Sequence, residues 1–470
     1  MDPITIHNPA VKGFDEQAII SKYLRANSLE LSNYLSDINE PHYLFWSKAQ
    51  YRKPPEGYTE KEAWLTARLL RKMSSTTGPI IAQDGEHFTW NKLGGFDEIL
   101  HDIDLKTGGK FLVNAANIED RQKFLSRGII EEAIASSQLE GASTTRKYAK
   151  KMIAENKKPR NKSEWMIFNN YQTMMAIDED YKERPMSLEL LLEMHAQLTK
   201  NAMEPGDEGE VGKLRDEGEV IHVVYNDRIA YETPSRKFVD EQLRQFIKYA
   251  NDNTKFLHPI IKATILHYWV GYLHPFVDGN GRLARSVFYW YLLKNDYWGM
   301  AYIPISMVLK RSKKQYTYAY IYSEQDNHDL TYFIDFSLRR IKRALQEFDE
   351  YVAGLQEENR LIELKLKNVL MLNDRQKQLV YYLVSDTTNY VSELSHRTMN
   401  GVARNTARSD LASLCDKDLL DKIKEGKHVR YYASKKLFKL INKPVKMGQS
   451  RPSSNTDKNG NNKRNQARLF

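Results

Sequence analysis

The most apolar part of the chain surrounds one polar segment. Residues 259–273 carry apolar and aromatic side chains at almost every position, and residues 286–294 repeat this pattern. Both stretches are shorter than a membrane span and are apolar all round, which is typical of helices buried in a protein core. Residues 274–285, between them, are rich in polar, charged and glycine residues. The pattern therefore predicts a helix, a polar loop and a second helix at the centre of the fold.

Apolar residues at helical spacing predict further helices on both sides of this centre. The predicted helices cover residues 128–139, 148–154, 164–176, 188–198, 238–249, 313–322 and 329–343. We therefore expect a mostly α-helical core domain over residues 116–344.

Two short β-hairpins interrupt the helical pattern. The β-prone runs 220–225 and 228–231 flank Asn226-Asp227, a dipeptide that suits a tight turn. Asp84-Gly85, between apolar residues on both sides, predicts a second small hairpin within residues 1–115. The rest of that region reads as a helical N-terminal extension, with an accessory or target-positioning role.

A different pattern begins after the core. Residues 345–371 are charged and amphipathic, which predicts a linking helix. Three short helical patterns follow at 375–384, 390–399 and 403–414, and two β-prone runs follow these at 419–423 and 429–432. Three helices and a hairpin resemble a winged helix-turn-helix domain, here over residues 372–442.

In such a domain the third helix faces the DNA major groove. The resemblance implies that the residues facing DNA would be Arg404, Asn405, Thr406 and Arg408. Winged helices also serve as protein contacts, so both kinds of partner stay open.

Charge and cysteine content narrow the function classes. The formal net charge of the 470 residues is +9, but residues 443–470 hold seven Lys or Arg and one Asp, which leaves about +3 for the rest. The basic excess belongs mainly to this tail, which its composition predicts to be disordered, and the folded body is near-balanced. Cys415 is the only cysteine, so internal disulfides are excluded. Without an export signal or a membrane-span pattern, we expect a soluble protein of the cytoplasm.

The polar segment 274–285 concentrates groups that handle phosphates. His274 is a candidate general base for an attacking hydroxyl, and Asp278 offers the oxygen ligand that Mg²⁺ prefers. The turn Gly279-Asn280-Gly281 can bring backbone N–H groups close to an anion, because glycine tolerates positive φ and has no side chain.

Two arginines complete this segment. Arg282 and Arg285 are three residues apart, so on a helix they share one face and could grip successive phosphates. A helix that begins near Arg282 would add its free N–H groups to the same anion site. The alternative without a binding function is a helix-loop-helix corner with solvated arginines. The presence of six chemically different kinds of group within twelve residues argues against this alternative.

The order His-Pro-Phe-x-Asp-Gly-Asn-Gly-Arg-x-x-Arg over residues 274–285 resembles the signature of Fic-domain proteins and matches it at every fixed position. Such proteins mostly transfer AMP from ATP to a Ser, Thr or Tyr hydroxyl of a target protein. The resemblance implies His274 as general base, Asp278 as Mg²⁺ ligand, and ATP and Mg²⁺ as cofactors. It also implies that the α-phosphate contacts Asn280 and the amides of Gly279 and Gly281, and that the β- and γ-phosphates contact Arg282 and Arg285.

A second motif lies N-terminal to this segment. Glu140 follows the predicted helix 128–139, where a carboxylate faces the negative end of the helix dipole and needs a cationic partner. Ser136-x-x-x-Glu140-Gly141 resembles the inhibitory motif of the same family, in which the glutamate pairs with the second motif arginine. That arginine would be Arg285, and the pair would block the γ-phosphate position.

The resemblance extends to two further sites. Tyr316 would line the adenine site, and the hairpin 220–231 would act as a flap that pairs with a target segment and presents its hydroxyl to His274. The predicted function is a protein adenylyltransferase that also modifies itself and is inhibited by Glu140. Open alternatives are removal of AMP, transfer of another phosphate-bearing group, or a DNA-binding regulator that senses nucleotide. A homodimer is an open alternative to a monomer.

Overall fold

The structure is a computed structural model that describes residues 2–7, 9, 15–25, 28–107, 118–154, 156–367, 371–385, 389–425 and 428–441. The chain divides into two compact units, Met1–Phe348 and Asp349–Phe470. The sequence predicts four boundaries, at residues 115, 344, 371 and 442, whereas this division has one, after Phe348. Residues 443–470, predicted to be disordered, lie outside the described residues.

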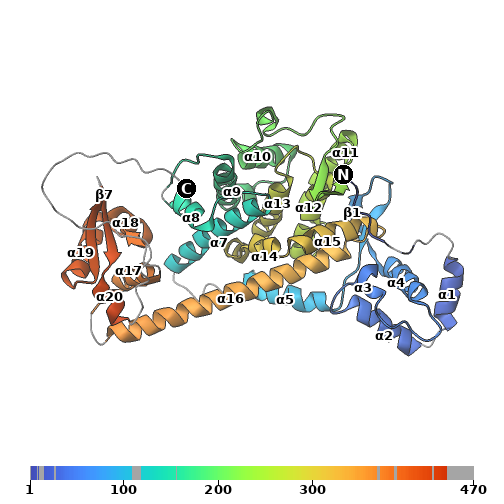
Figure 1. Cartoon of the computed structure of the whole chain (residues 1–470), viewed down its shortest axis with the longest axis horizontal. Helices are drawn as coiled ribbons and strands as arrows, with labels where there is room; N and C mark the ends of the chain where they lie inside the picture. The colour runs from blue at the N-terminus through green and yellow to red at the C-terminus, as the bar shows by residue number, and fades with distance from the viewer. Residues whose placement is uncertain are drawn as a thin grey trace, which may run out of the picture. The chain divides into compact units, whose positions relative to one another are not determined.

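Two packed helices, α12 (Pro259–Leu273) and α13 (Asn280–Lys294), form the centre of the first unit (Figure 1). Almost all of their residues are buried, as the apolar pattern predicts. Helix α13 begins at Asn280, two residues before the start expected near Arg282. The reason is local, because Gly279 adopts φ +85° and turns the chain directly into the helix. The second half of the polar segment is therefore helical.

The other helices of the first unit surround this pair. Helix α7 (Ile118–Leu139) packs on α9 (Lys162–Glu179), and on its other sides contacts α14 (Ile305–Arg311) and the short helix η3 (Trp298–Tyr302). The remaining helices of this layer are α8 (Arg146–Ala154), η1 (Tyr181–Glu183), α10 (Leu188–Thr199), η2 (Glu208–Glu210), α11 (Arg236–Asn251), α15 (Lys313–Gln325) and α16 (Thr331–Lys367). The predicted core helix 329–343 and most of the predicted linking helix are thus one continuous helix, α16.

Both predicted hairpins are present in the first unit. Strands β3 (His222–Tyr225) and β4 (Arg228–Glu232) pair antiparallel through a turn in which Asn226 and Asp227 both have positive φ. Such a turn matches the natural twist of a hairpin. Strands β1 (Thr76–Ile81) and β2 (His87–Trp90) form the other hairpin.

The N-terminal region is helical, as predicted, but it is not a separate module. Its helices are α1 (Glu16–Arg25), α2 (Ser28–Asn39), α3 (Trp46–Ala49), α4 (Glu60–Ser74) and α5 (Gly95–Thr107). Buried side chains of this region, such as Phe45, Trp64 and Phe88, belong to the same hydrophobic cluster as those of α12 and α13. The region therefore supports the central pair directly.

The second unit has its own small core. It contains α17 (Asp374–Ser385), β5 (Tyr390–Val391), α18 (Glu393–Asn400), α19 (Arg404–Asp416), β6 (Leu420–Glu425), β7 (His428–Ala433) and α20 (Lys435–Leu440). The three strands form one antiparallel sheet in the order β5-β7-β6.

One prediction in this unit was wrong. The helix expected at 390–399 begins only at Glu393, because Tyr390 and Val391 pair with β7 instead. Ser392 then caps the helix through a hydrogen bond from the backbone N–H of Ser395.

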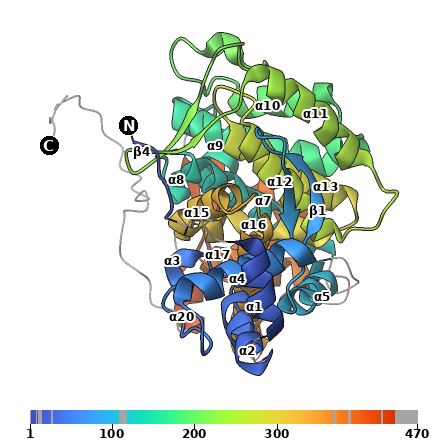
Figure 2. The ribbon, with the colours of Figure 1, turned by 90° about the vertical axis from the view of Figure 1, so that its right-hand side faces the viewer.

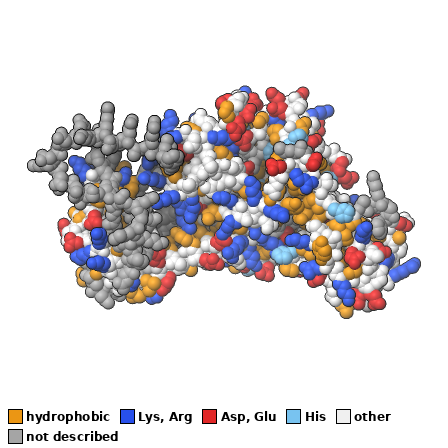
Figure 3. All heavy atoms as spheres, in the orientation of Figure 1, with side chains coloured by type: hydrophobic (Ala, Val, Ile, Leu, Met, Phe, Trp, Pro, Cys, Tyr) orange, Lys and Arg blue, Asp and Glu red, His pale blue; other side chains and the backbone are white. Residues whose placement is uncertain are grey.

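The surface of the first unit carries side chains of both charges. Lys and Arg side chains are interspersed with acidic and apolar ones over the face of the first unit seen in Figure 3, and acidic side chains gather above α10. Among the described helices, none is both long enough and apolar enough to span a bilayer.

Candidate active site

His274 ends helix α12 in a strained position. It adopts a left-handed conformation with φ 47°, and its backbone N–H still donates to the carbonyl of Val270 at 3.0 Å. Its ring Nδ1 lies 3.2 Å from the carbonyl oxygen of Gly271, which can only accept a hydrogen bond. Nδ1 therefore carries the proton and Nε2 keeps its lone pair. Burial lowers the pKa of His274 below its ordinary value, so the ring is neutral near pH 7.

Arg215 fixes the loop that follows His274. Its side chain is fully buried, and Nε donates to the carbonyl of His274 at 3.0 Å. The two Nη atoms donate to the carbonyls of Glu219, at 2.6 Å, and Pro234, on either side of the β3–β4 hairpin. One guanidinium thus holds the flap and the candidate base together. Arg215 lies shortly before the flap in the sequence, and these bonds were not predicted.

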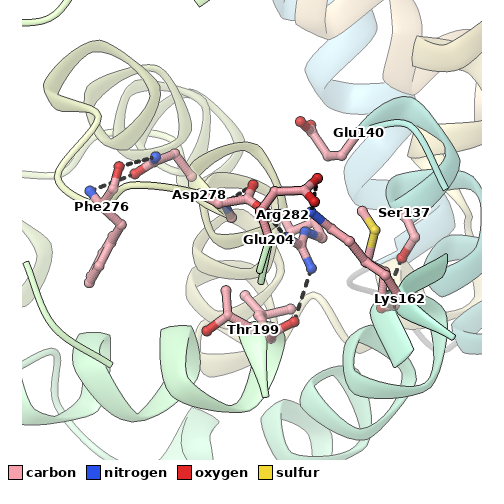
Figure 4. A network of polar contacts seen from close by, with 12 residues as sticks. Ser137, Glu140, Lys162, Thr199, Glu204, Phe276, Asp278 and Arg282 are labelled. Atoms are coloured by element: carbon pink, nitrogen blue, oxygen red, sulfur yellow. Dashed lines mark hydrogen bonds and ion pairs between the residues drawn. The ribbon is translucent and has the colours of Figure 1, made fainter. Parts of the chain in front are cut away.

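The loop between α12 and α13 is closed by Asn280. Its Oδ1 accepts from the N–H of Phe276 at 3.0 Å and its Nδ2 donates to the carbonyl of Phe276 at 2.7 Å (Figure 4). The side chain that the resemblance placed on the α-phosphate is therefore engaged in the loop itself. What Asn280 offers to an anion is its backbone N–H, in the first turn of α13, where such groups lack a partner within the helix.

A histidine outside the predicted set supports the same loop. The Nε2–H of His195, on α10, donates to the carbonyl of Asp278 at 2.9 Å, while Nδ1 accepts from the N–H of Gly212 at 3.1 Å. Its ring stacks on Phe276 with centroids 3.7 Å apart. Burial lowers the pKa of His195 to about 4, so it stays neutral. The only sequence signal was a histidine on the apolar face of a predicted helix.

The two motif arginines are buried and only partly satisfied. Nη1 of Arg282 donates to the carbonyl of Leu198 at 3.0 Å, and Nη2 lies 3.5 Å from Oδ2 of Asp278 (Figure 4). Nε and Nη2 of Arg282 and Nη1 of Arg285 lack a hydrogen-bond partner in the described structure. Buried unpaired guanidinium N–H groups are costly, and a phosphate would satisfy them.

Asp278 is the candidate metal ligand. Its Oδ2 lies 3.8 Å from Nζ of Lys162, which also donates to Glu204 at 2.6 Å (Figure 4). The described residues contain no cluster of three or more His, Cys, Asp or Glu side chains that could hold a metal ion. A single half-exposed carboxylate fits a Mg²⁺ ion that takes its other ligands from phosphates and water. Lys162 was not predicted from the sequence.

The second motif, residues 136–141, contacts Arg285 in the structure. Nη2 of Arg285 donates to Oε1 of Glu140 at 2.9 Å and to the carbonyl of Ser136 at 3.0 Å, and Nε donates to Oγ of Ser136 at 2.8 Å. Gly141 has φ +99° and ends the helix there. A Cβ atom on Gly281 would lie 2.2 Å from Oε1 of Glu140. The carboxylate therefore lies directly over the first turn of α13.

Two contacts hold α7 in this position. Gly128 lies so close to η3 that a Cβ atom would be 2.6 Å from backbone atoms of Ala301 and Tyr302. The buried carboxylate of Glu132 accepts from the N–H of Ser306 and from the hydroxyl of Tyr289, both at 2.9 Å. Burial raises the pKa of Glu132. These contacts lie outside the sequence predictions, because they depend on segments far apart in the chain.

A cavity of about 220 Å³ is lined by polar residues of the candidate site and by a set of tyrosines, here called the aromatic wall. His274, Glu140 and Arg285 line one part of it. The side chains of Tyr231, Tyr268, Tyr272, Tyr316 and Tyr320 line much of the rest. The cavity therefore combines a cationic, N–H-rich end with a flat apolar one, as a nucleotide requires.

Tyr316 and Glu324 add polar groups to the lining of this cavity. The hydroxyl of Tyr316 hydrogen-bonds Nε2 of His267 at 2.8 Å, which orients the ring that the resemblance placed at the adenine. Glu324 also lines the cavity, and burial raises its pKa to about 7. Asp278, Asn280 and Arg282 do not line this cavity.

The DNA-binding candidates lie on helix α19 of the second unit. Arg404 and Arg408 are exposed, and both contact the carboxylate of Glu393, with Arg404 Nε at 2.5 Å from Oε1 and Arg408 Nη2 at 3.4 Å from Oε2. Thr406 is half-buried.

Comparison with known proteins finds a family model that matches part of the chain. Residues 185–292, which include the whole segment 274–285, match the sequence model of the Fic/DOC family. Glu140 lies outside the matched residues.

Curated relatives share the adenylyltransferase name. Protein adenylyltransferase fic-1 of Caenorhabditis elegans is 38% identical over 101 residues, which cover 21% of this chain and 18% of that protein. Protein adenylyltransferase Fic of Nematostella vectensis is 24% identical over 268 residues, which cover 55% of this chain and 56% of that protein. The chain thus spans less than two thirds of either relative.

Among solved structures, a Fic family protein from Desulfovibrio desulfuricans aligns with 72% of this chain and 94% of its own, at 18% identity and a TM-score of 0.47.

Proposed function

We propose that this protein transfers AMP from ATP to a hydroxyl group of a protein. The observation that carries the proposal is the single cavity lined by His274, Arg285 and the tyrosine wall. A neutral imidazole with a free Nε2 can accept a hydroxyl proton, and the buried guanidinium can bind phosphate oxygens. The adenylyltransferase names of the relatives support the same reaction.

In the proposed reaction the target hydroxyl oxygen attacks the α-phosphorus of ATP. His274 Nε2 takes the hydroxyl proton as the new oxygen–phosphorus bond forms. The bond from the α-phosphorus to the oxygen that bridges to the β-phosphate breaks, and pyrophosphate leaves. The Nδ1–H bond to the carbonyl of Gly271 would hold the ring in the tautomer that this step requires.

The phosphates would be bound by groups at the start of α13. The free backbone N–H groups of its first turn suit the α-phosphate, and Arg285 and Arg282 suit the outer phosphates. We assign Asp278 to a Mg²⁺ ion shared with those phosphates, and such an ion would neutralise part of their charge. Tyr316 and the neighbouring rings would stack on the adenine.

The same proposal includes inhibition by Glu140. Its carboxylate occupies one N–H of Arg285 and the space over Gly281, where an outer phosphate would otherwise lie. ATP would then bind without the alignment that attack on the α-phosphorus requires. Ser136 supports this state through two hydrogen bonds that hold the guanidinium against α7.

The identity of the transferred group can be tested by intact mass spectrometry. The Glu140→Gly variant is incubated with ATP and Mg²⁺, and we expect self-modified protein heavier by one AMP. The matched control is Glu140→Gly with His274→Ala, which should keep its original mass. An adduct with the mass of a phosphate, or loss of AMP from a modified protein, would identify the alternative reactions and overturn the proposal.

A further inference from the structure

The chain's own residues 2–6 lie beside the flap as an extra strand. The N–H of Ile4 donates to the carbonyl of Ile229 at 2.7 Å, and the N–H of Ile229 donates to the carbonyl of Asp2 at 3.0 Å. Pro3 and Ile229 form a parallel bridge, and Arg228 Nη2 donates to the carbonyl of Pro3 at 2.8 Å. Figure 2 shows this end of the chain beside β4. The backbone groups of Ile229 that face away from β3 are therefore paired within the molecule.

The end of α15 binds the next backbone groups along the same segment. Gln325 Nε2 donates to the carbonyl of Ile4 at 2.8 Å, and Oε1 accepts from the N–H of Ile6 at 2.9 Å. A side-chain amide that bonds residues i and i+2 imitates the edge of a neighbouring strand. The backbone of the segment is thus bonded first by Ile229 of β4 and then by the side chain of Gln325.

One side chain anchors the segment next to the cavity. Ile4 is buried and forms a small hydrophobic cluster with Ala230 and Ile321. Both of these residues also line the cavity that contains His274. Thr5, the next residue, is exposed, as the alternation of a strand requires. The segment therefore packs behind one wall of the candidate active site, with Ile4 as its buried anchor and Ile6 packed against the same cluster.

From these contacts we infer that the outer edge of β4, together with Gln325, is a docking edge for an extended peptide with a branched aliphatic anchor, and that residues 2–6 fill it in cis. Main-chain pairing accepts many sequences, while the Ala230–Ile321 site selects the anchor. A target segment of this kind would have to displace residues 2–6 before its hydroxyl could reach the cavity. The inference rests on the proposed function for the role of this edge, but not for the binding itself.

The binding can be measured without nucleotide. The probe is a fluorescent peptide of residues 2–9, and its anisotropy is followed on titration with the full-length chain. In the wild type the internal segment competes, so we expect weak binding. In the Ile4→Asp variant the internal segment loses its anchor, and the peptide should bind at least ten-fold more tightly.

Matched variants separate anchoring from general disruption. Thr5→Ala changes an exposed side chain of the same segment and should behave as the wild type. Ile6→Pro removes the N–H that donates to Gln325 Oε1 and the packing of the Ile6 side chain, so it should expose the edge while Ile4 itself is kept. A peptide that itself carries Asp at the position of Ile4 should not bind, and one with Val there should bind.

Hydrogen exchange gives an independent readout. The amide of Ile229 should exchange faster in Ile4→Asp than in the wild type, and addition of the unlabelled peptide should restore its protection. Equal peptide binding by the wild type and both exposing variants, or no binding by any of them, would overturn the inference. Neither result would affect the AMP-transfer proposal, which the adduct mass tests separately.

Discussion

At the residue scale, the candidate site depends on the protonation state of His274 and on the hydrogen-bond partners of Arg285. His274 is neutral with its proton on Nδ1, because burial lowers its pKa and the carbonyl of Gly271 accepts only from an N–H. Arg285 is held by Ser136 and Glu140, and the two N–H groups of its Nη1 have no partner in the described structure. The proposed base can therefore accept a proton, while the arginine proposed to bind phosphate is already paired with Glu140.

His274→Ala should abolish transfer and leave ATP binding largely intact, because the ring acts on the hydroxyl proton and not on the phosphates. Loss of a general base typically costs on the order of 10²–10⁴-fold in rate. AMP incorporation by the Glu140→Gly chain, with and without His274→Ala, measures the first effect, and titration with a fluorescent ATP analogue measures the second. Transfer at an unchanged rate would remove His274 from the role of base.

Glu324→Gln should change how stability depends on pH. The pKa of Glu324 is about 7 in the folded protein against 4.5 in its ordinary state, so the folded form binds more protons between these values. Stability of the wild type should therefore fall as pH rises through this window, because a buried carboxylate must be charged. The melting temperature of Glu324→Gln relative to the wild type should rise from pH 4.5 to 7 and level off above it. A difference that does not depend on pH would contradict the assigned burial.

At the element scale, the structure depends on how α7 and α13 approach each other. The helix start at Asn280, the left-handed Gly279 and the turn at Gly141 place the Glu140 carboxylate over the first turn of α13. The absence of a side chain at Gly128 lets α7 pack closely on η3. The residues of segment 274–285 could be predicted to lie close together, because a short turn between two helices leaves its side chains few arrangements.

Other parts of the site could not be predicted, for a physical reason. His195 and Lys162 lie on α10 and α9, and the packing of these helices against α13 sets their partners. Arg215 lies in the loop before β3, and its bond to His274 joins segments 59 residues apart. The resemblance implied that Asn280 contacts the α-phosphate, and the use of its side-chain amide to close the loop was not predicted. Tyr390 and Val391 fit a helical pattern locally, and pairing with β7 overrides it.

The arginines of α19 provide a test of the second unit. Arg404 and Arg408 both contact Glu393, and this carboxylate would repel a DNA phosphate. If they contact DNA, Arg404→Ala with Arg408→Ala should remove sequence-specific binding and leave AMP transfer unchanged. Selection from a random DNA pool with the wild type and the double variant measures this. Retention of DNA without sequence preference by both chains would favour a protein contact.

At the scale of the whole molecule, the first unit surrounds the site with segments from most of its length. The helices of the N-terminal region share one hydrophobic cluster with α12 and α13, and residues 2–6 return to the flap. In the proposed function, regulation and chemistry share one core, in which α7 would restrain the phosphate-binding end and residues 2–6 would cover the proposed target-binding edge.

The central claim is that this core is an AMP transferase restrained by the pair of Glu140 and Arg285, and the initial rate of AMP incorporation tests it most directly. The rate is measured with radiolabelled ATP and Mg²⁺ for the wild type, Glu140→Gly, and Glu140→Gly with Arg285→Ala, each shown to be folded by circular dichroism. Removal of the carboxylate should raise the rate strongly, and loss of Arg285 should cancel the gain because the freed partner is gone. A rate in Glu140→Gly equal to or below that of the wild type would contradict the account.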